Sequence, residues 1–247
     1  MSRWLFDLGN TRLKCAPLTE DGTIGDVHAL ANDAGGWAAA LDALLPARVD
    51  VAWVASVAAP ALTSALADAL AARARAVSFA RTQASACGVR IAYAQPHKLG
   101  VDRFLSMIGA HARIPGPILL CGVGTALTID LLAADGRHIG GRIAPSPDLM
   151  RAALHARATH LPVDGGTYAE FAAETRDALA SGCEGAAVAL VERSLAQARQ
   201  VLGTAATPLL HGGGAPAMAP HLGGARVEPA LVLRGLAAWA RAGATRD

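Results

Sequence analysis

Two hydrophobic patterns alternate along the chain. Short apolar runs bounded by Gly, Pro or Asp predict buried β-strands, and longer Ala- and Leu-rich stretches with apolar residues at helical spacing predict helices. The expected strands are residues 4–7, 12–18, 49–57, 76–80, 89–92, 118–121, 126–132, 138–143 and 209–211. The expected helices are residues 35–47, 61–75, 102–112, 146–158, 175–202 and 229–242. Strands and helices in this mixed order indicate an α/β fold.

A strand, a glycine turn and a returning strand occur twice in the sequence. The first such unit spans residues 4–18 and the second spans residues 118–132. The two units share little sequence identity, so the pattern alone leaves an internal duplication open. The run Pro-Gly-Pro at residues 115–117 is the strongest break in the middle of the chain. We therefore expect two domains, residues 1–115 and residues 116–247.

The composition excludes several classes of protein. Of the 247 residues, 53% are hydrophobic and 17% are charged, which is enough apolar surface for a core and excludes a disordered chain. The net charge is +2 and there is no long basic run, so nucleic acid is not expected as a partner. The longest uncharged apolar stretch, residues 114–129, is too short for a membrane span and is interrupted by Pro and Gly. We expect a cytoplasmic protein that acts on small molecules and not on a membrane.

Common catalytic and nucleotide-binding motifs are missing from the sequence. There is no P-loop, no G-x-G-x-x-G after the first strand, no G-x-S-x-G elbow and no H-E-x-x-H pair. The cysteines lack both C-x-x-C spacing and a nearby His at a zinc-ligand interval, so we expect buried, unbridged side chains in a reducing compartment. These cysteines are Cys15, Cys87, Cys121 and Cys183.

The first glycine turn carries a set of groups suited to a nucleotide phosphate. Gly9 lets the main chain approach a ligand closely, and Asn10 and Thr11 add side-chain donors. Lys14 adds a positive charge, and Asp7 offers an oxygen ligand for Mg²⁺. The same spacing also suits an ordinary β-hairpin, and the residues alone do not decide between the two.

Two further segments are candidates for chemistry, and each has a plain structural alternative. The second glycine turn offers the Thr125 hydroxyl, but tight turns between buried strands are common. Asp102 at the start of an expected helix could accept a proton from a substrate hydroxyl, and the adjacent Arg103 could hold an anion. An acid beside an arginine at a helix start is also an ordinary helix cap. The run His-Gly-Gly-Gly at residues 211–214 is not specific by itself.

The order of these pieces is more specific than any one of them. The chain reads D-L-G-N-T at the N-terminus, then Tyr93, G-V-D-R, G-T-A-L-T-I-D, G-G-R-I, a Thr to Ser-Gly segment and H-G-G-G. In this order it resembles the type III pantothenate kinases of the acetate and sugar kinase/Hsc70/actin superfamily, which include Bvg accessory factor-like proteins. The resemblance covers essentially the whole chain.

The resemblance implies a fold and an activity. It implies two actin-like, ribonuclease H-like domains of duplicated topology, with mixed sheets flanked by helices and an active site in the cleft between the domains. It implies ATP-dependent phosphorylation of pantothenate to 4'-phosphopantothenate, the first step of coenzyme A biosynthesis. It also implies a homodimer that requires Mg²⁺ with ATP and a monovalent cation, K⁺ or NH₄⁺.

The resemblance also implies roles for individual residues. Asp102 would be the proton acceptor, Thr125 would contact ATP, and Thr175 would close the substrate pocket from across the dimer interface. Asp7 would be an outer ligand of the magnesium–ATP complex. The first phosphate-binding segment would comprise Asp7, Leu8, Gly9, Asn10, Thr11, Arg12, Leu13 and Lys14. The pantothenate pocket would comprise Tyr93, Gly100, Val101, Asp102 and Arg103.

One position departs from the family pattern. The second phosphate loop of the family reads D-x-G-T-A, and its Asp is the ligand of the monovalent cation, whereas this chain has Gly122 there. Either another group or water supplies the ligand, or dependence on the cation is weak or absent. Two other functions therefore stay open. The chain could be a regulatory or accessory protein that keeps the kinase fold, or a kinase for another hydroxy acid.

Overall fold

The computed structural model describes residues 2–32 and 36–244, and the chain forms two compact units. The first unit contains the chain up to Pro115 together with the C-terminal segment from Ala230. The second unit is Gly116–Pro229. We expected a second domain of residues 116–247, whereas the described part of its C-terminal segment, residues 230–244, groups with the first unit. Within the described ranges, no helix is both long enough and apolar enough to cross a bilayer.

The first unit is built on a mixed five-stranded sheet. Its order is β3 (His28–Ala31), β2 (Arg12–Pro17), β1 (Arg3–Leu8), β4 (Val49–Ser56) and β5 (Ala74–Phe79). β1, β2 and β3 form an antiparallel meander, and β4 and β5 continue the sheet parallel to β1. The crossover from β4 to β5 is made by α2 (Pro60–Ala71), as parallel neighbours require.

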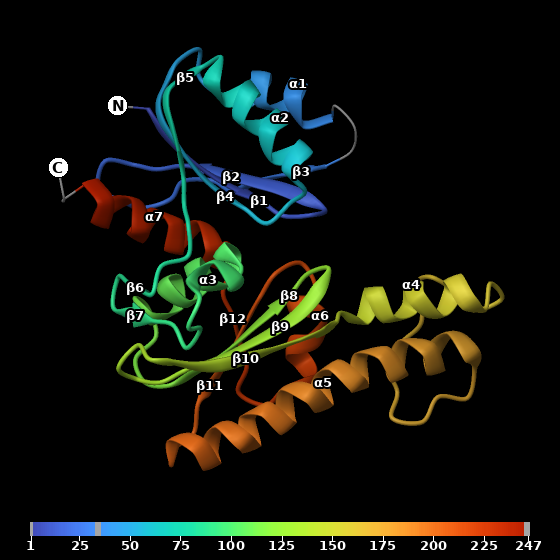
Figure 1. Ribbon diagram of the computed structural model, residues 1–247. Coiled ribbons are helices and arrows are strands. Elements are labelled where there is room, and N and C mark those ends of the chain that lie inside the picture. Colours follow the sequence, from blue (N-terminus) through green and yellow to red (C-terminus); the bar gives the residue numbers. More distant parts are fainter. Residues whose placement is uncertain (1, 33–35, 245–247) are drawn as a thin grey trace. The chain divides into compact units, whose positions relative to one another are not determined.

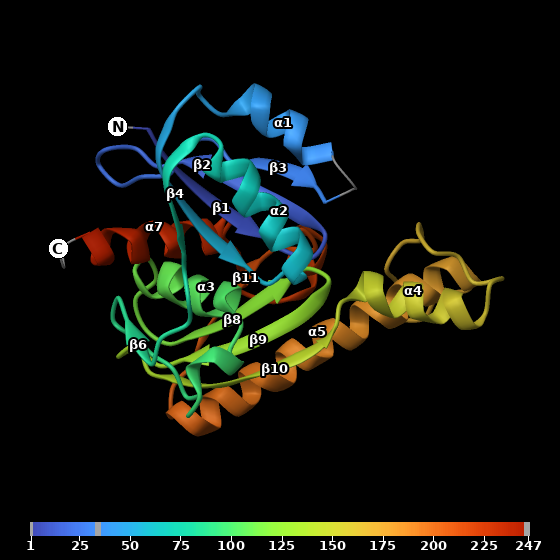
Figure 2. The same cartoon turned by 45° about the horizontal axis from the view of Figure 1, so that its top comes forward.

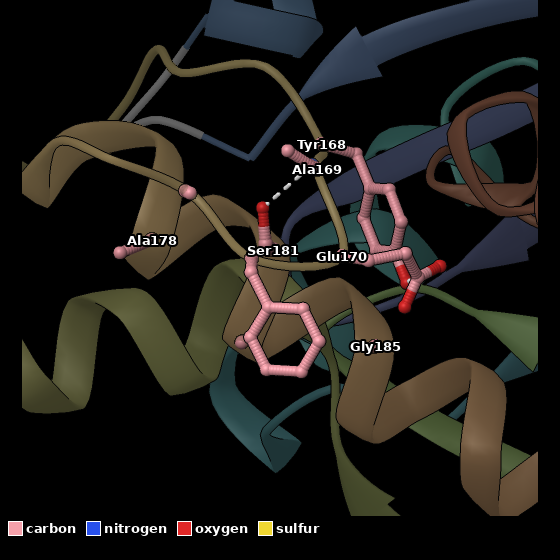
Figure 3. A pocket seen from close by; sticks show the side chains of 9 residues that line it. Tyr168, Ala169, Glu170, Ala178, Ser181 and Gly185 are labelled. Atoms are coloured by element: carbon pink, nitrogen blue, oxygen red, sulfur yellow. Dashed lines mark hydrogen bonds between the residues drawn. The ribbon is translucent and has the colours of Figure 1, made fainter.

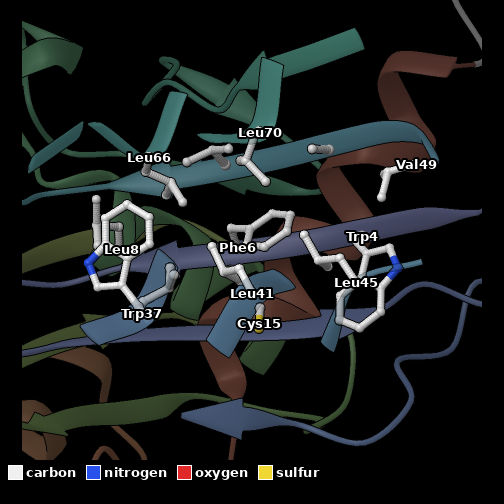
Figure 4. Packing of buried hydrophobic residues seen from close by; sticks show 13 residues of the cluster. Trp4, Phe6, Leu8, Cys15, Trp37, Leu41, Leu45, Val49, Leu66 and Leu70 are labelled. Carbon is white, nitrogen blue, oxygen red and sulfur yellow. The ribbon is translucent and has the colours of Figure 1, made fainter. Parts of the chain in front are cut away.

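Helices cover this first sheet on both faces (Figure 1). α1 (Gly36–Leu44) and α2 pack on the face that presents Phe6, and Figure 4 shows Leu41 and Leu66 close to that ring. α7 (Leu231–Ala244) packs on the other face, against β1 and β4. The buried cluster on the Phe6 face is therefore made mostly of aliphatic side chains packed around Trp4, Trp37 and Phe6.

Two glycines let α7 lie directly against α3 (Val101–His111) in the first unit. A Cβ at Gly109 would lie 2.6 Å from the carbonyl oxygen of Leu231, and a Cβ at Gly235 would overlap the carbonyl oxygen of Leu105. The helix backbones are in contact at this crossing, and no larger residue fits without a shift. This contact explains why the C-terminal helix belongs to the first unit. A small hairpin of β6 (Ser85–Ala86) and β7 (Val89–Arg90) and a 3₁₀ turn, Pro96–Lys98, precede α3.

The second unit repeats the topology of the first. Its sheet has the order β10 (His138–Pro145), β9 (Ala126–Leu132), β8 (Ile118–Val123), β11 (Thr207–His211) and β12 (Arg226–Val227). β8, β9 and β10 are antiparallel, and β11 and β12 run parallel to β8. The duplication that the sequence left open is therefore present in the topology of the two sheets.

Helices of the second unit pack on the sheet and on one another. The long helix α5 (Thr175–Leu202) buries Ala187, Val188 and Val191 against Leu119 and Ile129 of the sheet. α4 (Pro147–Arg157) lies beside the N-terminal part of α5 (Figures 1 and 2). A short helix α6 (Ala215–Met218) and a 3₁₀ turn, Ala219–His221, follow β11.

Candidate active site

The first glycine turn connects β1 to β2 and is tied to a neighbouring strand end. The amide of Gly9 donates to the carbonyl of Arg12 at 3.0 Å, which closes the turn. Asn32, just after β3, donates from Nδ2 to the carbonyl of Gly9 at 2.7 Å and from its amide to the carbonyl of Thr11 at 3.1 Å. The side chains of Asn10 and Thr11 are exposed. The turn is thus a fixed loop whose polar side chains face solvent, as phosphate binding needs.

Asp7 lies at the end of β1, where its side chain is half-buried beside the turn. It is paired in register with Lys14 of β2. Burial raises the pKa of the Asp7 carboxyl from 3.8 to about 7, the Lys14 charge opposes this rise, and the Asp102 charge adds to it. The carboxylates of Asp7 and Asp102 repel one another here, and a bound divalent cation would reduce that repulsion. The donor set therefore fits Mg²⁺, which binds through one or two carboxylates and the phosphates of its nucleotide.

Asp102 occupies the first turn of α3, where its carboxylate folds back over the helix N-terminus. Its Oδ1 accepts the amide of Arg103 at 2.8 Å. A Cβ at Gly100 would lie 2.6 Å from the same oxygen, so only glycine leaves the carboxylate in this position. The partial positive charge of the helix N-terminus favours the ionised form of a carboxylate placed there. Asp102 is thus held as an acceptor, and its charge acts on Asp7 in the same unit.

Arg103 and Tyr93 come together next to Asp102. The Arg103 side chain is buried, with 6% of the residue exposed, and its Nη1 donates to the Tyr93 hydroxyl at 3.4 Å. A buried guanidinium beside a phenol is suited to holding a carboxylate or hydroxyl group of a small molecule. The sequence-predicted substrate residues Tyr93, Gly100, Asp102 and Arg103 thus lie together in the first unit, and Val101 is the buried first residue of α3.

The second glycine turn connects β8 to β9. The amide of Gly124 donates to the carbonyl of Ala126 at 3.0 Å, and the Thr125 side chain is exposed at the tip. Ser146, a buried residue, donates from its hydroxyl to the carbonyl of Thr125 at 3.0 Å and accepts the amide of Leu149 at 3.2 Å. One hydroxyl therefore both caps α4 and holds the turn. The predicted N-cap at Ser146, with Pro147 as the next residue, is confirmed.

The glycine run after β11 is packed onto this second turn. Gly212 has φ of +96°, and a Cβ there would overlap the carbonyl of Val123. The amide of Gly214 donates to that same carbonyl at 3.1 Å. Two of the three glycines are thus needed for close packing against Val123, the last residue of β8 before the turn. The remaining one, Gly213, has open space around its Cα.

Thr175 is the first residue of α5, and its side chain is exposed. The preceding Glu174 caps the helix by accepting the amide of Asp177 at 2.8 Å. Beside this helix start lies a pocket of about 460 Å³, shown in Figure 3. Its wall includes Tyr168 and Ser181, and the Ser181 hydroxyl accepts the amide of Ala169 at 2.8 Å. Thr175 lies in the second unit and does not line this pocket, whose wall begins on α5 at Ala178, and the sequence analysis did not predict the pocket.

The cysteines and the candidate metal ligands of the described residues give no sign of a second site. All four cysteines are unbridged, and burial raises the pKa of the Cys15 and Cys121 thiols to about 12. Such thiols are inert packing side chains at neutral pH. Among the described residues, no three His, Cys, Asp or Glu side chains cluster as a metal site would require.

The chain is similar to known proteins over most of its length. The sequence profile of the family described as type III pantothenate kinase matches residues 4–197. The type III pantothenate kinase of Stenotrophomonas maltophilia (strain K279a) is 60% identical over 240 residues, which cover 97% of this chain and 98% of that protein.

Two solved structures are similar in fold. A Baf family protein of Campylobacter jejuni has a TM-score of 0.65 at 18% identity, over 98% of this chain and 99% of that one. The activator of the 2-hydroxyisocaproyl-CoA dehydratase from Clostridium difficile, solved with bound ADPNP, has a TM-score of 0.51 at 12% identity, over 100% and 97%. At these identities the likeness shows the fold alone, and the expected actin-like fold of duplicated topology is confirmed. With the profile match and the 60% identity, the chain belongs to the type III pantothenate kinase family.

Proposed function

We propose that this chain transfers the γ-phosphoryl group of ATP to the primary hydroxyl of pantothenate, giving 4'-phosphopantothenate and ADP, the first step of coenzyme A biosynthesis. The observation that carries the proposal is the group of Asp102, Arg103 and Tyr93 at the start of α3, with Asp7 near enough for the two carboxylates to repel. Membership of the family supports the choice of pantothenate. The proposal places the reaction in the cytoplasm, where ATP is made.

In this proposal Asp102 accepts the hydroxyl proton while the hydroxyl oxygen attacks the γ-phosphorus. The new bond joins that oxygen to phosphorus, the bond to the β–γ bridging oxygen breaks, and ADP leaves with the electron pair. Arg103 holds the carboxylate of pantothenate, and Tyr93 positions Arg103 through its hydroxyl. Because phosphoryl transfer depends mainly on positioning and on charge stabilisation, one fixed acceptor and one fixed cation are suitable machinery.

The nucleotide phosphates are assigned to the two glycine turns. Asn10, Thr11 and Lys14 offer donors and a positive charge at the first turn, and Thr125 offers a hydroxyl at the second. Asp7 would hold Mg²⁺ as an outer ligand, and the ion when bound neutralises charge on the phosphate oxygens.

The test is ADP formation with and without pantothenate, in the wild type and in Asp102→Asn. The variant should bind ATP normally and lose about 10²- to 10⁴-fold in turnover, since it keeps the shape of the side chain but cannot accept the proton. Asp148→Asn is a matched control, because Asp148 occupies the same second helical position in α4. It should keep turnover within about twofold. Near-normal turnover of Asp102→Asn would remove this residue from the mechanism.

The same assay separates the two other functions. Turnover with a different hydroxy acid and none with pantothenate would make the chain a kinase for another acceptor. No turnover with any hydroxylated acceptor would favour a regulatory protein with a kinase fold. Intact Asp7, Asp102 and Arg103 support the active enzyme over the latter.

We further propose that the chain is a homodimer formed through α4 and α5. A hollow of about 800 Å³ runs between these helices, and its wall is almost entirely apolar, with Leu149 42% and Leu154 44% exposed. The nearby Phe171 is 99% exposed. Apolar surface of this kind on one helix pair is typical of an interface between subunits.

Sedimentation velocity tests the dimer directly. At micromolar concentration the wild type should sediment with twice the mass of the monomer. The Leu154→Glu variant should sediment as a monomer, because dimer formation would bury a carboxylate without a partner. Val201→Glu is the control, since Val201 is an exposed apolar residue of α5 outside the hollow. A monomeric wild type would refute the dimer.

A further inference from the structure

Gly122 lies between two polar side chains at the end of the second sheet. It is paired with Thr128 of β9 and with His211 of β11, one on each side of β8. Residues directly paired on neighbouring strands point to the same face of a sheet. The Thr128 hydroxyl and the His211 imidazole therefore flank the side of Gly122 on which a side chain would project.

These two groups already fill the space that a side chain at this position would need. A Cβ built on Gly122 would lie 2.6 Å from Thr128 Oγ1, 2.9 Å from His211 Nε2 and 3.2 Å from His211 Cε1. Two of these separations are shorter than any real Cβ contact, and a carboxylate would extend further still. With Thr128 and His211 in these positions there is no room at residue 122 for an aspartate, nor for a cation held by one, which is the arrangement expected from the family.

The imidazole is held in this place by the backbone around it. Gly212 and Gly214, the first and third glycines after it, pack onto Val123, and the amide of Gly214 donates to the carbonyl of Val123 at 3.1 Å. β11 also pairs in parallel with β8 up to His211 itself. His211 is thus fixed beside Gly122, its partner in β8, and next to the second glycine turn.

We infer that the second glycine turn of this chain works without a monovalent cation, and that the His211 imidazole, beside the Thr128 hydroxyl, binds the nucleotide phosphate in its place. A ring N–H can donate to a phosphate oxygen, and a fixed donor in a partly buried site stabilises anionic charge as a bound cation would. The inference rests on the proposed function, since it assigns the phosphate of that reaction to a further residue.

The first experiment measures pantothenate-dependent ADP formation in choline chloride, KCl, NH₄Cl and NaCl at one ionic strength, with the Tris salt of ATP. The inference predicts that kcat/KM for ATP varies by less than about twofold among the salts, because no cation site exists to fill. Stimulation of about tenfold or more by K⁺ or NH₄⁺ would overturn it. Absence of turnover in every salt would contradict the proposed function instead.

A second measurement does not depend on turnover. The melting temperature with Mg²⁺ and ATP should be the same in KCl as in choline chloride, because a ligand shifts stability only when it binds the folded state. A rise that is specific to K⁺ or NH₄⁺ and appears only with ATP would overturn the inference.

Variants test the role of His211 itself. His211→Ala should raise the KM for ATP by about tenfold or more, because that is the loss of affinity expected when a hydrogen bond to a charged group is removed. His211→Gln should show a smaller rise in this KM, because glutamine restores a hydrogen-bond donor. The triple variant Gly122→Asp/Thr128→Ala/His211→Ala removes both obstructing groups and should gain stimulation by K⁺. An unchanged KM in His211→Ala would refute its contact with the phosphate.

Gly223→Ala serves as the control for substitution of a glycine. Gly223 lies in the same unit, has no atom within 4 Å of a built Cβ, and does not have a positive φ. Its melting temperature and its KM for ATP should equal those of the wild type. A matching change in this control and in His211→Ala would show a general effect of substitution in the second unit and would overturn the assignment of His211.

Discussion

The protonation of Asp7 predicts how the stability of the protein depends on pH. Burial raises the pKa of the Asp7 carboxyl from 3.8 to about 7. The Lys14 charge opposes this rise, and the Asp102 charge adds to it. Between these two values the folded protein holds a proton that the unfolded chain releases. The free energy of unfolding therefore falls as pH rises from about 4 to about 7, and this contribution is fully lost above that range.

The size of the effect follows from the difference between the two pKa values. A shift from 3.8 to about 7 corresponds to about 4 kcal/mol as an upper bound, because each pKa unit is worth about 1.4 kcal/mol. Over the accessible window from pH 5 to pH 8, about 2–3 kcal/mol of this should appear. Asp7→Asn has no proton to lose, so its stability relative to the wild type should increase by that amount across the window. Urea denaturation at four pH values measures the difference.

Asp21 provides a control of opposite sign. Hydrogen bonds from the Thr19 hydroxyl and from the amide and hydroxyl of Thr23 lower its pKa to about 2, and the carboxyl is fully exposed. Its stabilising contribution is present above the unfolded pKa and is lost only as pH falls toward 2, so Asp21→Asn should differ from the wild type by a constant amount between pH 5 and pH 8. The reasoning about Asp7 is refuted if Asp7→Asn also differs by a constant amount.

Two further substitutions test how the fold holds the site. Gly235→Ala should lower the free energy of unfolding by about 1–3 kcal/mol, because the new Cβ overlaps the carbonyl of Leu105; a thermal melt equal to that of the wild type would contradict the close helix crossing. Ser146→Ala should cost about 1 kcal/mol from the lost helix cap and should raise the KM for ATP more than the KM for pantothenate, because the hydroxyl also holds Thr125; equal changes in both KM values would contradict this.

The local elements could be predicted from the sequence because their signals are local. The two strand–turn–strand units, the cap at Ser146 and the long helix from Thr175 to Leu202 appear where the pattern put them. The strands β3 and β12 were missed, since both are short edge strands with exposed positions and neither has a fully buried residue. The helix expected to run to residue 75 ends at Ala71, because Ala74 is already paired with Val49 in the sheet.

The features of the site that could not be predicted depend on contacts between residues far apart in the sequence. Asn32 fixes the first turn from 23 positions away, and only the pairing of β3 with β2 brings it there. The packing of α7 on α3 depends on two glycines whose role is invisible until the helices cross. The neighbours of Gly122 could not be predicted, because they come from the pairing of β8 with both β9 and β11. The replacement of an expected acid by glycine at this position was nevertheless visible in the sequence.

The central claim is that this chain phosphorylates pantothenate, and ³¹P NMR of the products tests it most directly. With Mg²⁺, ATP and pantothenate, the wild type should convert the γ-phosphate signal into one phosphomonoester that couples to the methylene protons of pantothenate, with ADP in equal amount. ADP with inorganic phosphate alone, or no change in the ATP signals, would contradict the account.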